Sequence, residues 1–314
     1  MTVELALDAP DYDDLPRDEV LGLPHSWGIL DPNIGSVSQI SPEAVIGAAA
    51  TISVGAAVSL NLGLDEIDPP LFNRAQWRHR IEASDRNTFE DELDAYNPQS
   101  SSQWDGFRHV RARERGFYGG VTDLENAGDV LGIEHLANHG IVGRGVLLDF
   151  ASWCRRVGRT HDPMGPSPIS AADLAAVIAD QHVELRTGDI LCIRSGWVAA
   201  YRNLSPEQRK NERVSREFTG LRADDEMARF LWNLHPGAIA IDNPGFEWAP
   251  GDPQDGLLHR RLQPLLGMVM GELLDFEELA QRCAEQHRNE FLFVAAPLPV
   301  PGGLSSPSNA IALL

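Results

Sequence analysis

Basic residues are scarce in this sequence of 314 residues: 26 Lys and Arg face 46 Asp and Glu, a net charge of −20. Nucleic acids and anionic membranes are bound through clustered cations, so neither is expected as a partner. Long hydrophobic runs are missing too. The longest stretch of small apolar residues, 48–62, is interrupted by Thr, Ser and Gly, which excludes a membrane span. The N-terminus lacks the basic region and apolar core of a secretory signal.

Cysteine is also rare. The sequence has Cys154, Cys192 and Cys283, which are far apart and odd in number, so no disulfide framework or zinc ribbon is expected. We interpret them as buried, reduced thiols of a cytoplasmic protein. A G-x-S-x-G motif and a phosphate-binding loop are absent. Gly143-Arg144-Gly145 precedes a predicted strand and lacks a third glycine, which argues against a dinucleotide site.

The pattern of apolar residues predicts a mixed α/β fold. Residues 1–40 are rich in Asp, Pro and Gly and predict an extended N-terminal arm, followed by one domain over 41–314. Residues 80–98 are polar and predict loops or short edge strands. Helices are predicted at 41–50, 170–182, 224–234 and 275–286, and strands at 51–62, 146–148, 190–194, 238–241 and 291–296.

Several polar side chains are candidates for chemistry. The segment 100–109 places Asp105 and His109 in a short stretch bounded by Pro98, a density typical of binding sites. Glu272 lies among apolar residues, where a carboxylate is either paired, bound to an ion or close to neutral. His259 and Asp242 are further candidates. The pair His135 and His139 has a metal-binding spacing, but it also fits the basic end of a helix before Gly140.

A set of short motifs follows in order along the chain: Ser26-Trp27-Gly28, 143–149, 188–197, Asp242-Asn243-Pro244, His259-Arg260, Gly271-Glu272-Leu273, 296–298 and Gly302-Gly303. Their order resembles the cyclase family of metal-dependent hydrolases, which includes kynurenine formamidase and isatin hydrolase. The resemblance covers nearly the whole chain. It implies a swivelling β/β/α fold, a small-molecule substrate and a homo-dimer or homo-tetramer.

The better-known members carry the signature H-x-G-T-H-x-D-x-P-x-H. Its Asp falls on Asp105 and its last His on His109, whereas its two earlier His, which bind metal in those members, fall on Gln99 and Gln103. Its Pro falls on Phe107. This chain is similar to the subgroup with Ser-Gln-Trp-Asp-Gly-x-Arg-His. An amide binds divalent transition metals far more weakly than an imidazole, so a metal site at Gln99 and Gln103 is not expected.

The resemblance implies one divalent ion, zinc or manganese, held by Asp105, His259 and Glu272. His109 would act as general base and then general acid while metal-activated water cleaves an amide, a cyclic amide or imide, or a lactone. Two alternatives stay open. The four residues Asp105, His109, His259 and Glu272 could transfer protons without a metal in a cyclase, isomerase or dehydratase. The chain could instead be a catalytically inactive, ligand-binding member of the family.

Four neighbouring residues are candidates for substrate binding: Gln103, Trp104, Phe107 and Arg108. Gln103 could also be a weak metal ligand. Trp104 and Phe107 would form an apolar wall of the pocket, or else anchor the loop in the core. The arginine-rich run 108–115 predicts either salt bridges at a subunit contact or an anchor for a substrate carboxylate.

Overall fold

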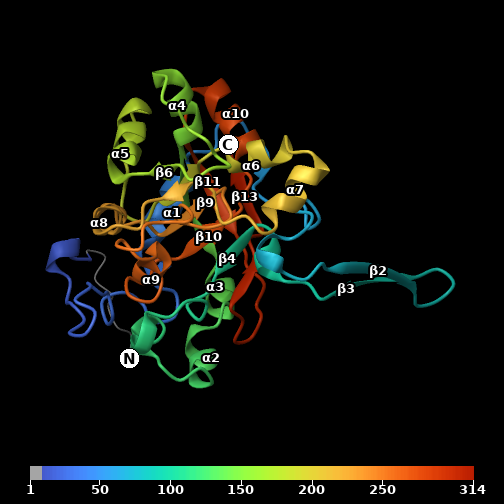
Figure 1. The fold of residues 1–314 in the computed structure, drawn as a ribbon, viewed down its shortest axis with the longest axis horizontal. Helices are drawn as coiled ribbons and strands as arrows, with labels where there is room; N and C mark the ends of the chain where they lie inside the picture. Colours follow the sequence, from blue (N-terminus) through green and yellow to red (C-terminus); the bar gives the residue numbers. More distant parts are fainter. Residues whose placement is uncertain (1–8) are drawn as a thin grey trace.

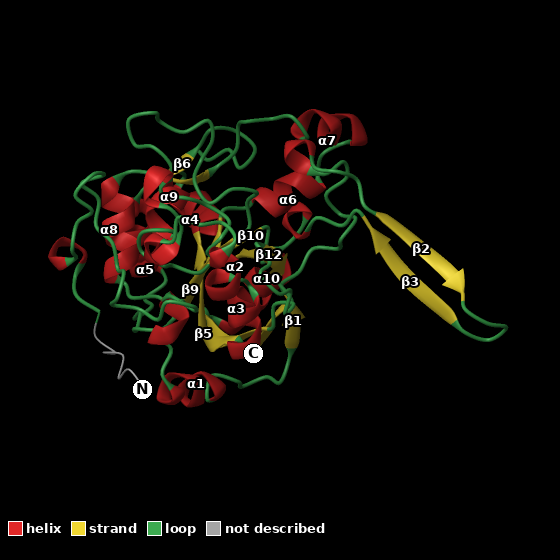
Figure 2. Ribbon diagram, turned by 90° about the horizontal axis from the view of Figure 1, so that it is seen from below, coloured by secondary structure: helices red, strands yellow, loops and turns green. Residues whose placement is uncertain are grey.

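The computed structural model describes residues 9–314, built around a nine-stranded mixed sheet that curls on itself (Figures 1 and 2). Its strand order is β1-β13-β11-β5-β7-β9-β10-β4-β12. The strands are β1 (Ala57–Ser59), β4 (Gln103–Asp105), β5 (Ile141–Asp149), β7 (Ile190–Arg194), β9 (Ala238–Ile241), β10 (Met270–Glu272), β11 (Glu290–Ala295), β12 (Ser305–Pro307) and β13 (Ala310–Leu313). A short parallel pair joins β6 (Pro168–Ile169) to β8 (Gly220–Leu221).

The centre of the sheet is parallel, from β5 through β7 and β9 to β10, and its flanks are antiparallel. β7 and β9 are buried along their whole length, which matches their continuous apolar sequences. The sheet curls far enough for Asn61, just after β1, to bridge to Leu274, just after β10. The predicted strand 51–62 is largely wrong in extent, because only Ala57–Ser59 pair as a strand.

Helices cover the sheet, with α4, α5 and α8 together on one side (Figure 1). Ser41, Ser170 and Asp224 cap α1, α5 and α8 with their side chains. The helices are α1 (Pro42–Ala49), α2 (Asn126–Leu131), α3 (Glu134–His139), α4 (Phe150–Val157), α5 (Ala171–Asp180), α6 (Trp197–Arg202), α7 (Pro206–Glu212), α8 (Asp225–Asn233), α9 (Leu258–Leu262) and α10 (Glu277–Gln286). Short 3-10 turns are η1 (Tyr12–Asp14), η2 (Ser36–Gln39), η3 (Leu71–Asn73), η4 (Pro98–Ser100), η5 (Arg113–Arg115) and η6 (Tyr118–Gly120).

Residues 9–40 contain no long helix or strand and lie against the domain. The indole of Trp232 donates a hydrogen bond to Pro10 O at 2.8 Å, and Ser26 N donates to Leu265 O at 2.9 Å. Further along, the Ser36 hydroxyl donates to Gly237 O. These contacts bring the segment next to α8 and to the chain that follows α9.

The strands β2 (Arg78–Ala83) and β3 (Phe89–Asp94) form a two-stranded hairpin that projects from the body (Figure 2). Every residue of both strands is exposed. These short strands fit the prediction of loops or short edge strands at 80–98, because each of them pairs on one side only. Their charged residues gave no sign of a buried face.

The mixed α/β fold in one domain is confirmed, and so is the cyclase-like arrangement of the sheet. Within residues 9–314, no helix has the length and apolar character needed to cross a bilayer. The three cysteines are buried and unpaired. A cytoplasmic location remains a prediction.

Candidate active site

The strands β4 and β10 hold three candidate side chains. They are antiparallel, with Gln103 opposite Glu272 and Asp105 opposite Met270. Because side chains alternate along a strand, Gln103, Asp105 and Glu272 point to one face and Trp104 to the other. Gln103 Nε2 donates to Glu272 Oε2 at 2.9 Å. All three are buried, and Asp105 has no exposed surface at all.

His259 on α9 lies between two carboxylates. Its Nδ1 is 2.5 Å from Glu247 Oε2, and its Nε2 is 3.0 Å from Glu272 Oε1. A carboxylate on one ring nitrogen fixes the orientation of the imidazole and directs the other nitrogen toward the centre of the site. Glu247 therefore orients His259 toward Glu272.

Electrostatics at this cluster follow from burial and close pairing. Burial disfavours the charged form of His259, but Glu247 and Glu272 outweigh it and raise the pKa of His259 well above its usual value. Burial raises the pKa of Glu272, with His259 acting in the opposite direction. The neighbouring imidazole lowers the pKa of Glu247, although burial acts against it. The site thus concentrates negative charge that a cation can balance.

The predicted ligand set meets in the structure. One ligand atom each from Asp105, His259 and Glu272 lie within 4.8 Å of one another. Two buried oxygens of this cluster accept no hydrogen bond, Asp105 Oδ2 and Gln103 Oε1, and Glu272 Oε1 contacts His259 Nε2 at 3.0 Å. Unsatisfied buried oxygens beside an oriented imidazole are what a divalent cation would satisfy. The residues present fit such an ion, with two carboxylates and one imidazole as donors.

His109 lies at the edge of the same cluster. Its Nε2 is 3.9 Å from Asp105 Oδ2, and 29% of its side chain is exposed. The amide nitrogen of Gln99 lies 3.0 Å from His109 Nδ1, 3.2 Å from its Nε2 and 3.3 Å from Asp105 Oδ1. That amide can donate to whichever ring nitrogen is unprotonated. His109 is thus positioned beside the ligand set and open to an approaching molecule.

Arg74 contacts the backbone of Gln99. Its guanidinium donates to Gln99 O at 2.5 Å. Burial lowers the pKa of Arg74, while the carboxylates of Glu272 and Asp105 act in the opposite direction. Arg74 therefore contributes positive charge near the carboxylates.

Two predicted substrate contacts lie elsewhere. Trp104 is fully buried; its ring packs edge-on against Phe293, and its indole N–H donates to Ser308 O at 3.1 Å. Phe107 is buried and packs against Tyr118 with ring centroids 4.9 Å apart. Both side chains anchor the loop in the core, so the proposed apolar wall of the pocket is not formed by them.

Arg108 is also engaged structurally. Its guanidinium donates to the backbone oxygens of Gly302 and Leu124. These bonds fix the loop that leads into α2 and engage both terminal nitrogens of the Arg108 guanidinium. Of the other early candidates, His139 ends α3 before Gly140, as the helix-end interpretation of that histidine pair expects.

Asp242 follows β9 and is fully buried. Its carboxylate accepts hydrogen bonds from Ser195 N, Ser195 Oγ and Gly196 N, at 2.6 to 2.8 Å. Burial raises the pKa of Asp242 to about 6, against the effect of these bonds. Asp242 thus ties the turn after β7 to the end of β9 and is absent from the ligand set.

Comparison with known proteins defines the class. The family model described as a putative cyclase matches residues 58–248. A solved structure described as a novel cyclase is 30% identical, with a TM-score of 0.79, and the match covers 92% of this chain and 99% of that chain. The chain therefore belongs to the cyclase family. Among curated proteins, no sequence matches it significantly.

More distant structures share the fold. Isatin hydrolase A from Ralstonia solanacearum is 16% identical, with a TM-score of 0.57 over 87% of this chain and 97% of that chain. An isatin hydrolase bound to the product analogue thioisatinate is 15% identical, also with a TM-score of 0.57, over 87% of this chain and 99% of that chain. At these identities the likeness is one of fold.

Sequence reasoning missed Glu247 and Arg74 and gave Gln99 no role of its own. Glu247 stands between Phe246 and Trp248, and a carboxylate between large apolar residues is the signal that could have identified it. Arg74 carried no comparable signal. Its contact with Gln99 depends on how the two ends of the hairpin meet.

Proposed function

We propose that this protein is a metal-dependent hydrolase that cleaves an amide, a cyclic amide or imide, or a lactone. The observation that carries the proposal is the convergence of Asp105, His259 and Glu272 beside two buried oxygens that lack hydrogen bonds, Asp105 Oδ2 and Gln103 Oε1. Membership of the cyclase family and the fold shared with isatin hydrolases support it. A divalent ion, zinc or manganese, would supply Lewis acidity that polarises a carbonyl group and makes water a stronger acid.

The chain's own residues have distinct parts in this proposal. Asp105, Glu272 and His259 would hold the ion, and Glu247 keeps the His259 ring oriented. His109 accepts a proton from the attacking water and returns it to the leaving nitrogen or oxygen. Gln99 holds the His109 ring beside Asp105 while that proton is transferred. Gln103 fixes Glu272 through its amide N–H.

Metal analysis of protein purified without chelator tests the proposal. We expect about one divalent ion per chain in the wild type and loss of that ion in His259→Ala. A screen of formamides, cyclic imides such as isatin, and lactones would identify the bond cleaved. Full metal occupancy in His259→Ala would remove this residue from the ligand set.

A second candidate is proton-transfer chemistry without a metal, as in a cyclase, isomerase or dehydratase. The 3.0 Å contact between His259 Nε2 and Glu272 Oε1 favours it, because the two groups already balance each other's charge. Activity that persists after verified removal of metal would support this candidate. An inactive, ligand-binding protein would bind the ion yet turn over none of the screened compounds.

The proposal includes a homo-oligomer, supported by the β2–β3 hairpin. Its register places His79, Ile81 and Ala83 on one face with Leu93, Asp91 and Phe89 as their respective partners, and the remaining strand residues, all charged, on the other. Ile81 and Phe89 are each 66% exposed. That face also holds the His79–Asp91 pair. Two isolated strands are marginally stable in water, so the exposed apolar side chains on this face call for a partner surface.

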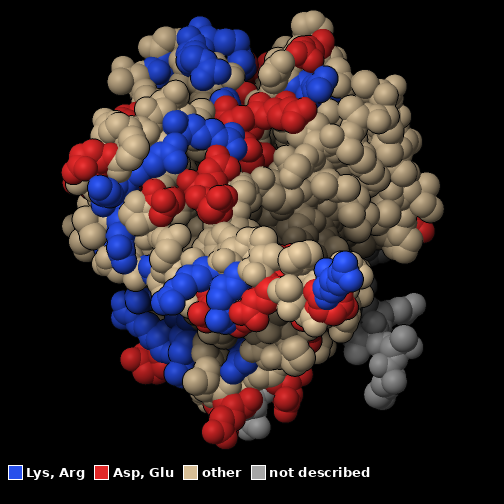
Figure 3. Space-filling view, turned by 90° about the vertical axis from the view of Figure 1, so that its right-hand side faces the viewer, with Lys and Arg blue, Asp and Glu red and all other residues tan. Residues whose placement is uncertain are grey.

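A second copy of the chain offers such a surface. Residues 44–64 and 291–314 contain no charged side chain in a protein of net charge −20. They include exposed Ile46, Val54 and Ile311, and β1 and β13 pair at the sheet edge. Figure 3 looks onto the side from which the hairpin projects and shows a broad area without charged residues. Two copies related by a twofold axis could each lay a hairpin on the other.

A further inference from the structure

Most arginines of the run 108–115 are held by other groups. Arg108 donates to backbone oxygens, Arg111 donates to Thr122 O at 3.2 Å, and Arg115 pairs with Asp18 at 2.5 Å. Arg113 differs, since its side chain makes no hydrogen bond or ion pair with any residue in 9–314. Its exposed guanidinium is therefore available for a ligand.

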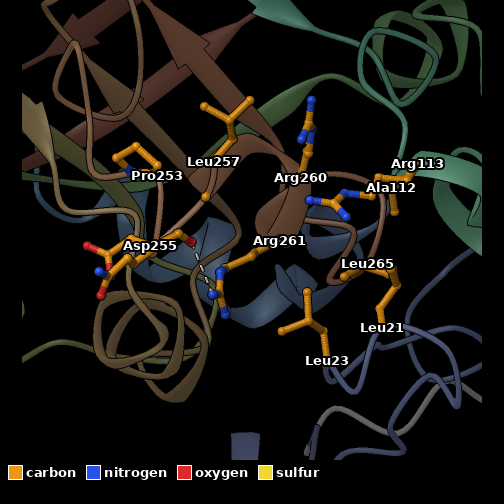
Figure 4. A pocket seen from close by; sticks show the side chains of 12 residues that line it. Leu21, Leu23, Ala112, Arg113, Pro253, Asp255, Leu257, Arg260, Arg261 and Leu265 are labelled. Atoms are coloured by element: carbon orange, nitrogen blue, oxygen red, sulfur yellow. Dashed lines mark hydrogen bonds between the residues drawn. The ribbon is translucent and has the colours of Figure 1, made fainter.

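Arg260 is a second such cation. It follows His259 on α9, is exposed, and has no ionic or hydrogen-bond partner for its side chain in the described part of the chain. Arg113 on η5 and Arg260 on α9 line the same hollow (Figure 4). Two guanidinium groups at one site are a recognised means of binding a carboxylate or phosphate.

The hollow that they line has both apolar and polar walls. It encloses about 240 Å³, and Leu21 and Leu23 contribute from the N-terminal segment while Leu257 and Leu265 flank α9. One carboxylate also lines it, that of Asp255, and Arg222 lies 3.4 Å from this group. Asp255 is therefore paired away from Arg113 and Arg260. Arg261 also lines the hollow, and it pairs with Asp225.

This hollow adjoins the candidate active site. Arg113 and Arg260 also line an open groove with His109, Val110, Arg111 and Glu114. The groove thus leads from the proposed general base to the two arginines and on to the leucines. Glu114 is its one acidic residue, against two unpaired guanidinium groups, so the groove favours a negatively charged ligand.

The backbone at Arg113 is strained. Its φ is +50°, a left-handed conformation that costs free energy for a residue other than glycine. The loop is closed by Ala112 N donating to Gly116 O at 2.8 Å and fixed to the N-terminal segment by the Arg115–Asp18 pair. Strain held by such contacts accumulates at binding sites.

We propose that Arg113 and Arg260 bind the carboxylate of the substrate, while Leu21, Leu23, Leu257 and Leu265 bind an apolar part of the same molecule. This rests on the proposed hydrolase function and narrows it: the substrate is an acidic amide, imide or lactone with an apolar substituent. The scissile bond lies toward His109, and the anionic group lies at the junction of groove and hollow.

Octanoate is a suitable probe, because it joins a carboxylate to an apolar chain and needs no turnover. Isothermal titration should show one saturable site on the wild type, with octanamide and acetate each binding at least about tenfold more weakly. Arg113→Met and Arg260→Met should each weaken octanoate binding at least about fivefold, and the double variant should abolish it. Arg86→Met, at the hairpin turn, removes the same charge elsewhere and should bind as the wild type does.

The titration is run with and without chelator, since a carboxylate could also bind a metal at Asp105, His259 and Glu272. Octanoate binding that vanishes with chelator but survives in the double variant would overturn the proposal. If octanamide bound as tightly as octanoate, the proposed role of the arginines would be overturned. If acetate bound as tightly as octanoate, the proposed role of the leucines would be overturned. Metal content and turnover are measured separately, so failure here is distinguishable from failure of the hydrolase proposal.

Discussion

Gln103 Nε2 donates a 2.9 Å hydrogen bond to Glu272 Oε2 across the β4–β10 pair. The matching position in better-known members of the family is a metal-binding histidine. Here the amide holds a carboxylate in place, and Gln99 similarly contacts Asp105 and His109. The two glutamines thus donate hydrogen bonds to candidate ligands. Because an amide binds divalent transition metals weakly, our proposal places one ion in each chain.

Removing the carboxylate behind His259 should weaken metal binding. Glu247→Ala leaves His259 Nδ1 without its partner, so we expect about 10- to 100-fold lower affinity for zinc or manganese. Titration of metal-free protein measures this, with Glu285→Ala on the exposed face of α10 as the control. Unchanged affinity in Glu247→Ala would show that the ring is oriented by other contacts.

His109 should affect turnover and leave the metal in place. His109→Asn removes the proposed proton carrier, and we expect kcat to fall by about 10²- to 10⁴-fold. Metal content should equal that of the wild type. His139→Asn, at the end of α3, is the matched control. A kcat within about threefold of the wild type would exclude His109 as general base.

Gly271 should tolerate no side chain, because a Cβ there would lie 2.9 Å from the Trp104 ring. We expect Gly271→Ala to reduce the free energy of unfolding by about 1–3 kcal/mol, through displacement of β10 from β4. Gly47→Ala in α1 meets no atom within 4 Å and should stabilise by about 0.5–1 kcal/mol. Urea unfolding compares the two, and equal effects would contradict the packing described.

Asp18 should make stability depend on acidic pH. Burial raises the pKa of Asp18, but hydrogen bonds from Leu21 N and Val20 N and the pair with Arg115 outweigh it and hold the pKa below its usual value. The contribution of Asp18 to the free energy of unfolding is therefore complete above pH about 4 and is lost as the pH falls through the lowered pKa. The stability difference between wild type and Asp18→Asn, from urea unfolding, should shrink below pH about 4. A difference that grows on acidification would contradict this.

The hairpin should determine assembly through one face only. Ile81→Lys places a charge beside the apolar side chains of Ala83, Phe89 and Leu93 on the same face. This variant should shift the protein toward the monomer, as measured by sedimentation velocity. Glu82→Lys, one residue away on the charged face, should leave the assembly state unchanged. If both variants sediment as the wild type does, the hairpin is not the contact between copies.

The sequence predicted best the elements with strong local signals. The strand 190–194 was predicted with its observed bounds, because an apolar run lies between the Gly188-Asp189 turn and Ser195-Gly196. The helix at 170–182 was found through its capping box, and Ala171–Asp180 form α5. The hairpin was not predicted, because its pairing buries nothing within the chain and its strands alternate charge with a few apolar residues.

The candidate site likewise contains residues that the sequence predicted and residues that it did not. Asp105, His259 and Glu272 were identified through a family resemblance, and the structure brings them together. Trp104 was assigned to the substrate, yet alternation along β4 alone places it opposite Asp105 and Gln103. Glu247 was not predicted because its partner, His259, is reached only when the loop after β9 folds back on α9. Such contacts depend on tertiary structure that no local pattern encodes.

The contact between Arg74 and Gln99 joins the two ends of the projecting hairpin at its base. Gln99 in turn contacts the imidazole of His109, the residue that we propose as proton carrier. If the hairpin is the contact between copies, a neighbouring subunit bound to it would act on His109 through this contact. We then expect turnover per chain to fall when the protein is diluted to the monomer.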